Sequence, residues 1–170
     1  LPIVTCLTTQ TTKNVVSIEP IEPSTLLEQA RTVLAESSVS VFKIGLLGSL
    51  EITQALHDLL SEHSNVPVIF DPVLRAGGGT ELSDSALIAA IKKLLLPLST
   101  VITPNTNELK SLTTDFQDFN SAAQEVLDCG AKHVLLTGTH ASSAQVINRL
   151  YSRSEDPSRA SDSDHDSQSN

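Results

Sequence analysis

One stretch decides the fold of this chain: Val66-Pro67-Val68-Ile69-Phe70-Asp71-Pro72-Val73-Leu74-Arg75-Ala76-Gly77-Gly78-Gly79-Thr80. Its apolar run, 68–70, shows no alternation, which is typical of a strand buried on both faces of a parallel sheet. Pro72 cannot donate a backbone hydrogen bond, so the strand must end before it. Asp71 is therefore expected at the carboxyl edge of the sheet, where open α/β sheets bind their ligands. The three glycines let the main chain approach a ligand closely, but a flexible strand-to-helix connection explains them equally well.

The bulk composition describes one domain with an aliphatic core. The chain has 170 residues, of which 39% are apolar and only 3% aromatic, and this length is enough for one substantial core. No apolar run approaches the length of a membrane span. The formal net charge of -9 argues against binding to nucleic acid or to an anionic membrane. Cys6 and Cys129 lie far apart in apolar surroundings, so we expect free thiols in a cytoplasmic protein.

Both ends of the sequence differ from the middle. The chain opens on Leu1-Pro2, contains no Met and lacks the basic start of a signal peptide, so we expect it to be a piece of a longer chain. Residues 152–170 are serine-rich and acidic, and we expect them to be disordered. The folded domain is accordingly expected to span residues 1–151.

Strands and helices alternate along this domain, which predicts an α/β fold with a mainly parallel sheet. Strands are expected at 3–7, 15–18, 39–47, 68–70, 100–103 and 133–136, with an antiparallel or edge strand within 145–151. Helices are expected at 24–36, after Ser49, at 83–96, from 105 onward and at 121–128. Ser24 and Ser49 are expected to cap the first two helices, Pro97 to stop the third and Gly130 to end the last.

Polar residues fall where these strands end. Neither a Walker sequence nor a G-x-G-x-x-G motif is present, so the two commonest nucleotide fingerprints are absent. Asn105 and Glu108 are three residues apart in the first turn of a helix and share a face. An amide and a carboxylate at this position can hold a hydrated magnesium ion that bridges ATP phosphates. The same pair is also the signature of an ordinary capping box, and the sequence leaves both interpretations open.

Five short segments occur in the order found in one enzyme family, and they are 4–11, 42–48, 70–74, 103–108 and 135–140. Together they resemble the hydroxymethylpyrimidine/phosphomethylpyrimidine kinases of thiamine biosynthesis, in the ribokinase-like superfamily. The resemblance covers residues 3–151. It implies a ribokinase-like three-layer α-β-α fold, incomplete in this chain, and ATP-dependent phosphorylation of a small pyrimidine, with a homodimer usual among relatives.

The resemblance also implies roles for particular residues. Gln10 corresponds to the glutamine that hydrogen-bonds the aminopyrimidine. Leu46 stands where the family often has a methionine that packs on the ring. Val73, in the Asp-Pro-Val segment, corresponds to a second contact with the pyrimidine.

The remaining implied residues concern ATP and Mg²⁺. Asn105 and Glu108 match the N-x-x-E motif that positions magnesium and phosphate. Thr137 and Thr139 match a turn that borders the nucleotide. Asp71 and Glu108 are the carboxylates that we expect beside the metal.

Two family segments have no match in this sequence. One is a Gly-Gly-Ala-Gly substrate segment with an upstream aspartate. The other is a late Gly-x-Gly-Cys or Gly-x-Gly-Asp segment that supplies the anion hole and the residue that deprotonates the acceptor. The glycines at 77–79 follow a different strand and do not replace it. We therefore assign no catalytic base in this chain and expect the chain alone to be inactive.

Two alternatives remain open on the sequence. A pyridoxal kinase would have the same fold and reaction but a different ring, and Gln10 with Lys43-Ile44-Gly45 favours the pyrimidine. The other alternative is a non-catalytic module that keeps a pyrimidine pocket and has lost phosphate transfer.

Overall fold

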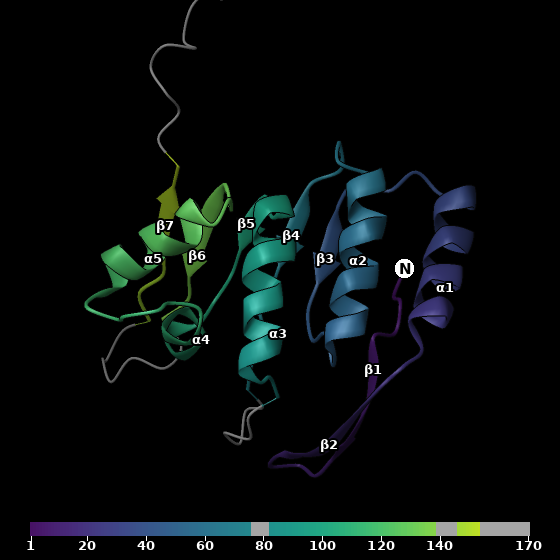
Figure 1. Cartoon of the computed structure of the whole chain (residues 1–170), viewed down its shortest axis with the longest axis horizontal. Helices are drawn as coiled ribbons and strands as arrows, with labels where there is room; N and C mark the ends of the chain where they lie inside the picture. Colours follow the sequence, from purple (N-terminus) through teal and green to yellow (C-terminus); the bar gives the residue numbers. More distant parts are fainter. Residues whose placement is uncertain (76–81, 139–145, 154–170) are drawn as a thin grey trace, which may run out of the picture.

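A computed structural model describes residues 1–75, 82–138 and 146–153 (Figure 1). Its main sheet has five strands in the order β3-β4-β5-β6-β7. These strands are β3 (Phe42–Ile44), β4 (Val68–Phe70), β5 (Val101–Ile102), β6 (His133–Leu136) and β7 (Arg149–Ser152). The first four pair in parallel, and β7 pairs antiparallel with β6. The predicted α/β fold with a mainly parallel sheet is confirmed.

Three of the helices connect consecutive parallel strands. They are α2 (Leu50–Glu62), α3 (Ser85–Ala90) and α5 (Phe119–Asp128), and they lie on the same face of the sheet (Figure 1). This follows from topology: right-handed crossovers between strands that advance in one direction place every helix on one side. The described residues thus supply two of the three expected layers.

The core lies between this helical layer and the sheet. Phe70, Ile102 and Val134 from the strands are fully buried, as are Ile91 and Val126 from the helical side. Helix α1 (Pro23–Glu36) is set apart from that core, because it packs on α2 through a smaller cluster of Leu26, Ile52 and Ala55. Figure 1 shows α1 at the far side of α2 from the sheet's centre.

The start of the chain forms a separate two-stranded sheet. Strand β1 (Cys6–Gln10) pairs antiparallel with β2 (Val15–Pro20), and neither joins the main sheet. The expected strand at 3–7 is therefore shifted toward the C-terminus. Thr8 and Thr9 lie in β1 and Thr11 follows it, and β-branched side chains of this kind suit a strand. The hairpin projects from the end of the molecule at which the parallel strands terminate (Figure 1).

Several boundaries differ from the prediction for local reasons. Helix α1 begins at Pro23 with Glu22 as its N-cap, not Ser24, because the fixed φ of proline suits the first helical position. Ser49 does cap α2, accepting a hydrogen bond from the Ile52 amide. The predicted strand 39–47 shortens to β3.

The helix predicted at 83–96 is divided into three pieces. Helix α3 is capped by Asp84, and it is followed by a π-helical turn at Ile91–Leu95 and a 3₁₀ turn at Leu96–Leu98. Pro97 was expected to end the helix at Leu96. It lies instead inside the 3₁₀ turn, and the helical segment ends at Leu98.

Helix α4 (Thr106–Ser111) follows β5 as expected. Helix α5 starts at Phe119, two residues before the expected start at Ser121, because Asp118 provides the N-cap. Gly130 has φ +114°, and a Cβ there would lie 2.8 Å from Pro97 Cα, so both conformation and packing require glycine.

The C-terminal boundary also moves slightly. Strand β7 includes Ser152, and the Arg153 amide donates to the Lys132 carbonyl, so sheet pairing continues past the expected limit at 151. Residues 154–170, expected to be disordered, lie outside the described residues. Among the helices that the structure describes, none combines the length and apolar character needed to cross a bilayer.

Candidate functional site at the carboxyl edge of the sheet

The predicted nucleotide residues gather where β5 and β6 end. Thr137 forms an isolated parallel bridge with Asn105, and its amide donates to the Pro104 carbonyl at 2.9 Å. The Thr137 hydroxyl approaches the same carbonyl at 3.4 Å. The structure therefore brings Asn105, Glu108 and Thr137 into one cluster. Thr139 lies outside the described residues.

Asn105 and Glu108 form a complete capping box at the start of α4. Asn105 Oδ1 accepts from the amides of Asn107 and Glu108, at 2.9 and 3.0 Å, and Glu108 Oε2 accepts from the Asn105 amide at 2.8 Å. Glu108 is 7% exposed and is the only charged residue among those described that is buried. The capping interpretation is confirmed, and the box also fixes the carboxylate at the ligand edge of the sheet.

Asp71 lies at the end of β4, as expected from Pro72. Its amide donates to the Ile44 carbonyl at 2.8 Å, and its Oδ2 lies 3.3 Å from Lys43 Nζ. The Lys43 and Asp71 side chains are 63% and 38% exposed, so water screens this pair and it adds little stability. Its effect is to place one cation and one anion at the edge of the sheet.

Leu46 and Val73, the predicted ring contacts, line one closely packed hollow, and the described residues around it leave it a free volume of about 0 Å³. It is formed by the loop that joins β3 to α2 and by the segment after β4, including Pro72. Gln10 is exposed at the end of β1 and is not among the described residues that line this hollow. The structure thus unites two of the three substrate residues and leaves the third on the hairpin.

A metal ion at this edge would depend on few protein ligands. Within the described ranges, no group of three or more His, Cys, Asp or Glu side chains is placed to hold one. Magnesium commonly uses one or two carboxylates together with water and phosphate oxygens. Asp71 and Glu108, which follow the neighbouring strands β4 and β5, fit that donor set.

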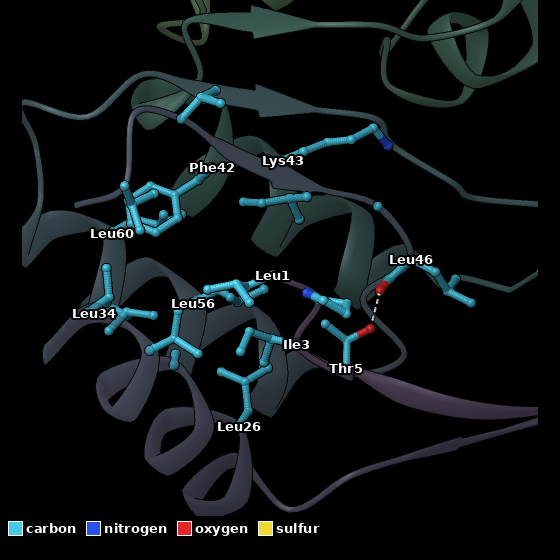
Figure 2. Close-up of a pocket in the computed structure, with 18 of the residues that line it drawn as sticks. Leu1, Ile3, Thr5, Leu26, Leu34, Phe42, Lys43, Leu46, Leu56 and Leu60 are labelled. Carbon is cyan, nitrogen blue, oxygen red and sulfur yellow. Dashed lines mark hydrogen bonds between the residues drawn. The ribbon is translucent and has the colours of Figure 1, made fainter. Parts of the chain in front are cut away.

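A larger cavity runs along the outer edge of β3, with a volume of about 630 Å³ (Figure 2). Its lining is mainly apolar and comes from α1, α2, β3 and the first residues of the chain, including Leu1, Leu26 and Leu60. Of the predicted site residues that the structure describes, only Leu46 lines this cavity. Within the described part of the chain, no strand pairs with this edge of β3.

Sequence reasoning missed one contact beside the site. The Thr5 hydroxyl donates to the Leu46 carbonyl at 2.6 Å, and Figure 2 shows this bond at the cavity rim. The two residues are 41 positions apart. No local pattern links a threonine in an irregular segment to a carbonyl in a distant loop.

Comparison with solved structures shows to which class of proteins this fold belongs. The chain superposes on a crystal structure of the phosphomethylpyrimidine kinase of Clostridium difficile with a TM-score of 0.77, at 26% identity over 90% of this chain and 68% of that one. A pyridoxal kinase of Staphylococcus aureus, solved in complex with pyridoxal, gives a TM-score of 0.73 at 27% identity, covering 88% of this chain and 56% of that one. The fold is that of the ribokinase-like small-molecule kinases.

The family within that class is also defined. The phosphomethylpyrimidine kinase family model matches residues 1–168. The hydroxymethylpyrimidine/phosphomethylpyrimidine kinase of Haemophilus influenzae is 34% identical over 146 residues, covering 84% of this chain. This chain belongs to the phosphomethylpyrimidine kinase family. It spans 54% of the Haemophilus protein, about half of that relative's length.

Proposed function

We propose that this chain is part of an ATP-dependent kinase that phosphorylates 4-amino-5-hydroxymethyl-2-methylpyrimidine and its monophosphate in thiamine biosynthesis. One observation carries the proposal beyond family membership. The buried carboxylate of Glu108 accepts a hydrogen bond from the Asn105 amide, and the Asn105 backbone pairs with Thr137 at the carboxyl ends of β5 and β6. This is the edge at which parallel sheets bind ligands.

The proposed reaction is an in-line transfer. An oxygen of the pyrimidine's hydroxymethyl group, or of its phosphate in the second step, bonds to the γ-phosphorus of ATP. The bond from that phosphorus to the bridging oxygen breaks, ADP leaves, and the acceptor proton passes to a base. Such transfer depends mainly on positioning and electrostatic stabilisation.

The residues of this chain have separate parts in the proposal. Gln10 reads the amino edge of the pyrimidine, while Leu46 and Val73 pack against the ring. Asn105, Glu108 and Thr137 hold the phosphate side of ATP. A bound Mg²⁺, held by Asp71 and Glu108 through direct or water-mediated contacts, would neutralise charge on the transferred phosphoryl group.

The alternative ring is pyridoxal, because the Staphylococcus pyridoxal kinase has nearly the same TM-score as the Clostridium enzyme. The experiment is therefore a comparison of two ligands. Calorimetric titration of the chain with hydroxymethylpyrimidine and with pyridoxal, each with MgADP present, should show tighter binding of the pyrimidine. Preference for pyridoxal would assign the vitamin B6 ring, and binding of neither ring would contradict the proposal.

The compartment and the assembly belong to the proposal as well. We propose a cytoplasmic enzyme, since ATP is its phosphate donor and Cys6 and Cys129 are both free thiols. We propose a homodimer, whose mass would be measured by light scattering.

A further inference from the structure

The β1–β2 hairpin is attached to the main domain at its base by a tight contact. The Thr5 hydroxyl donates to the Leu46 carbonyl at 2.6 Å, while the Thr5 carbonyl accepts from the Ile21 amide at 3.2 Å. Thr5 therefore joins both ends of the hairpin to the loop between β3 and α2. Figure 2 shows Thr5 pointing at Leu46 across the rim of the cavity.

Gly48 forms the other half of this contact. It has φ +86°, a left-handed conformation that side chains rarely adopt. A Cβ at this position would lie 2.9 Å from Cys6 Cβ and 3.5 Å from Pro20 Cγ. Cys6 and Pro20 are paired residues at the base of the hairpin. The absent side chain thus lets both hairpin strands lie against the loop that carries Leu46.

The alternation of β1 places Gln10 on the anchored face. Side chains two residues apart share a face of a strand, so Cys6, Thr8 and Gln10 project to one side. Cys6 faces Gly48, and Thr8 lines the cavity together with Leu46. The register shifts between Thr9 and Gln10, where β2 carries the extra residue Val16. Because the extra residue lies in β2, it does not interrupt the alternation of β1.

We propose that Thr5 and Gly48 are positioning residues that set the angle of the hairpin, so that Gln10 meets the same ring that Leu46 contacts. This inference rests on the proposed function. Thr5 and Gly48 do not touch the substrate in this account. They act through the hairpin and through the Leu46 loop, which they join to each other.

The length of the hairpin makes this anchor decisive. Gln10 is five residues beyond Thr5, or about 17 Å along a strand. A rotation of about 10° at the base moves a side chain at that distance by about 3 Å, enough to break a hydrogen bond to the ring. A small loss of order at Thr5 is therefore magnified at Gln10.

The test compares Thr5→Val, which removes the donor at constant shape, with Thr5→Ser, which keeps it. The control is Thr32→Val, because the Thr32 hydroxyl donates only within α1, to the Glu28 carbonyl at 2.8 Å. The first readout needs no ligand. Lys13 is exposed between the hairpin strands, so trypsin cleavage after Lys13 reports hairpin opening. The second readout is calorimetric binding of hydroxymethylpyrimidine, with the melting temperature measured in parallel.

We expect Thr5→Val to accelerate cleavage after Lys13 and to weaken pyrimidine binding about tenfold, as expected for losing one hydrogen bond to the ring. Thr5→Ser should match the wild type in both readouts, and Thr32→Val should change neither. Gly48→Ala should reproduce the Thr5→Val result with the hydroxyl intact, and it replaces that variant if Thr5→Val does not fold. The inference would be overturned if Thr5→Val and Gly48→Ala both behaved like Thr32→Val. It would also be overturned if these variants were cleaved faster but bound the pyrimidine as tightly as the wild type. If the wild type binds no pyrimidine, the proposed function fails, and the cleavage rates still decide whether Thr5 and Gly48 anchor the hairpin.

Discussion

Glu108 combines a structural bond with a position suited to catalysis. Its Oε2 accepts from the Asn105 amide, and it is almost fully buried. The change Glu108→Gln separates these roles, because glutamine also serves in a capping box. We expect the melting temperature to change little and turnover of the intact enzyme to fall at least about tenfold, since the carboxylate charge beside the metal is lost.

The control for this prediction is Asp118→Asn, which keeps a side-chain oxygen that can cap α5 and lies outside the proposed site, so both stability and turnover should change little. The measurements are thermal melts and initial rates of ADP formation at saturating pyrimidine. Full turnover in Glu108→Gln would leave the residue with its capping role alone.

Gln10 is predicted to hydrogen-bond one polar edge of the pyrimidine ring. Replacing it with alanine should weaken binding of hydroxymethylpyrimidine by about 1–3 kcal/mol, because a polar edge of the ring is left unpaired. The exposed position of Gln10 on β1 means that folding should not suffer. Calorimetry with the pyrimidine and with MgATP checks this, and ATP affinity should stay constant. Unchanged pyrimidine binding would remove Gln10 from the site.

Part of this site could be predicted from the sequence because the residues concerned lie close together in the chain. Asn105 and Glu108 are three residues apart, so one helical turn determines their relation. Asp71 was placed correctly because Pro72 forces the strand to end. The contact of Thr5 with Leu46 depends on two distant segments, and nothing within a few residues of either one encodes it.

At the scale of elements, Glu125 joins three parts of the helical layer. It lies in α5 and accepts from Lys92 Nζ, in the π-helical turn, at 2.8 Å. It also accepts from the Thr114 amide and hydroxyl at 3.0 and 2.9 Å. Burial raises the pKa of Glu125, but the bonds from Lys92 and Thr114 outweigh burial and hold the pKa below its usual value.

This lowered pKa gives a pH-dependent prediction. A carboxylate whose pKa is lower in the folded state stabilises the fold above its unfolded pKa, and the contribution is lost as pH falls through the folded pKa. Glu125→Gln should cost about 1–2 kcal/mol at neutral pH, and the difference from wild type should shrink below about pH 4.5. Urea unfolding at several pH values measures this.

The matched control is Asp128→Asn in the same helix. Asp128 accepts from Gln124 within α5 at 2.9 Å, an exposed contact that joins no second element. Its effect should stay within about 0.5 kcal/mol, as for most surface substitutions. An acid-independent difference for Glu125→Gln would exclude the ionised carboxylate as the stabilising group.

The existence of most elements was predictable, and their ends were less so. The buried strand at 68–70 was placed correctly because its apolar run and Pro72 define it locally. The helix at 83–96 kept its apolar face, but no local pattern indicated the π-helical turn before Pro97. The hairpin was shifted because cross-strand pairing between residues 6–10 and 15–20 orders polar threonines that resemble a loop.

At the scale of the whole molecule, the strand order explains why the described helices cover one face of the sheet. Four parallel strands advance in one direction, so their helices cover one face. The cavity along β3 opens at the far edge of this sheet. Half-buried strand residues such as Ile69 and Leu135 alternate with fully buried neighbours, as expected for a sheet that the described helices cover on one side.

The last prediction concerns phosphate transfer by the 170-residue polypeptide on its own. In-line transfer needs donors aimed at the transferred oxygens and a group that accepts the hydroxyl proton. Asn105, Glu108 and Thr137 supply only the first part of such a site. The glycine-rich segment that the resemblance assigns to the anion hole and the base has no match in this sequence. Removal of even one preorganised donor typically slows an enzyme by about 10² to 10³.

The measurement is the rate of formation of ADP and phosphorylated pyrimidine from MgATP and hydroxymethylpyrimidine. The intact Haemophilus influenzae kinase, which extends well beyond the matched residues, is the positive control. The polypeptide should be at least about 10² slower than this control, because the donors and the base act together in the transition state. Comparable turnover would mean that a described loop, or one of the segments 76–81, 139–145 and 154–170, provides the anion hole. Glycine-to-alanine changes at 77–79 would then be the first variants to make, since in the sequence these residues follow β4 and Asp71.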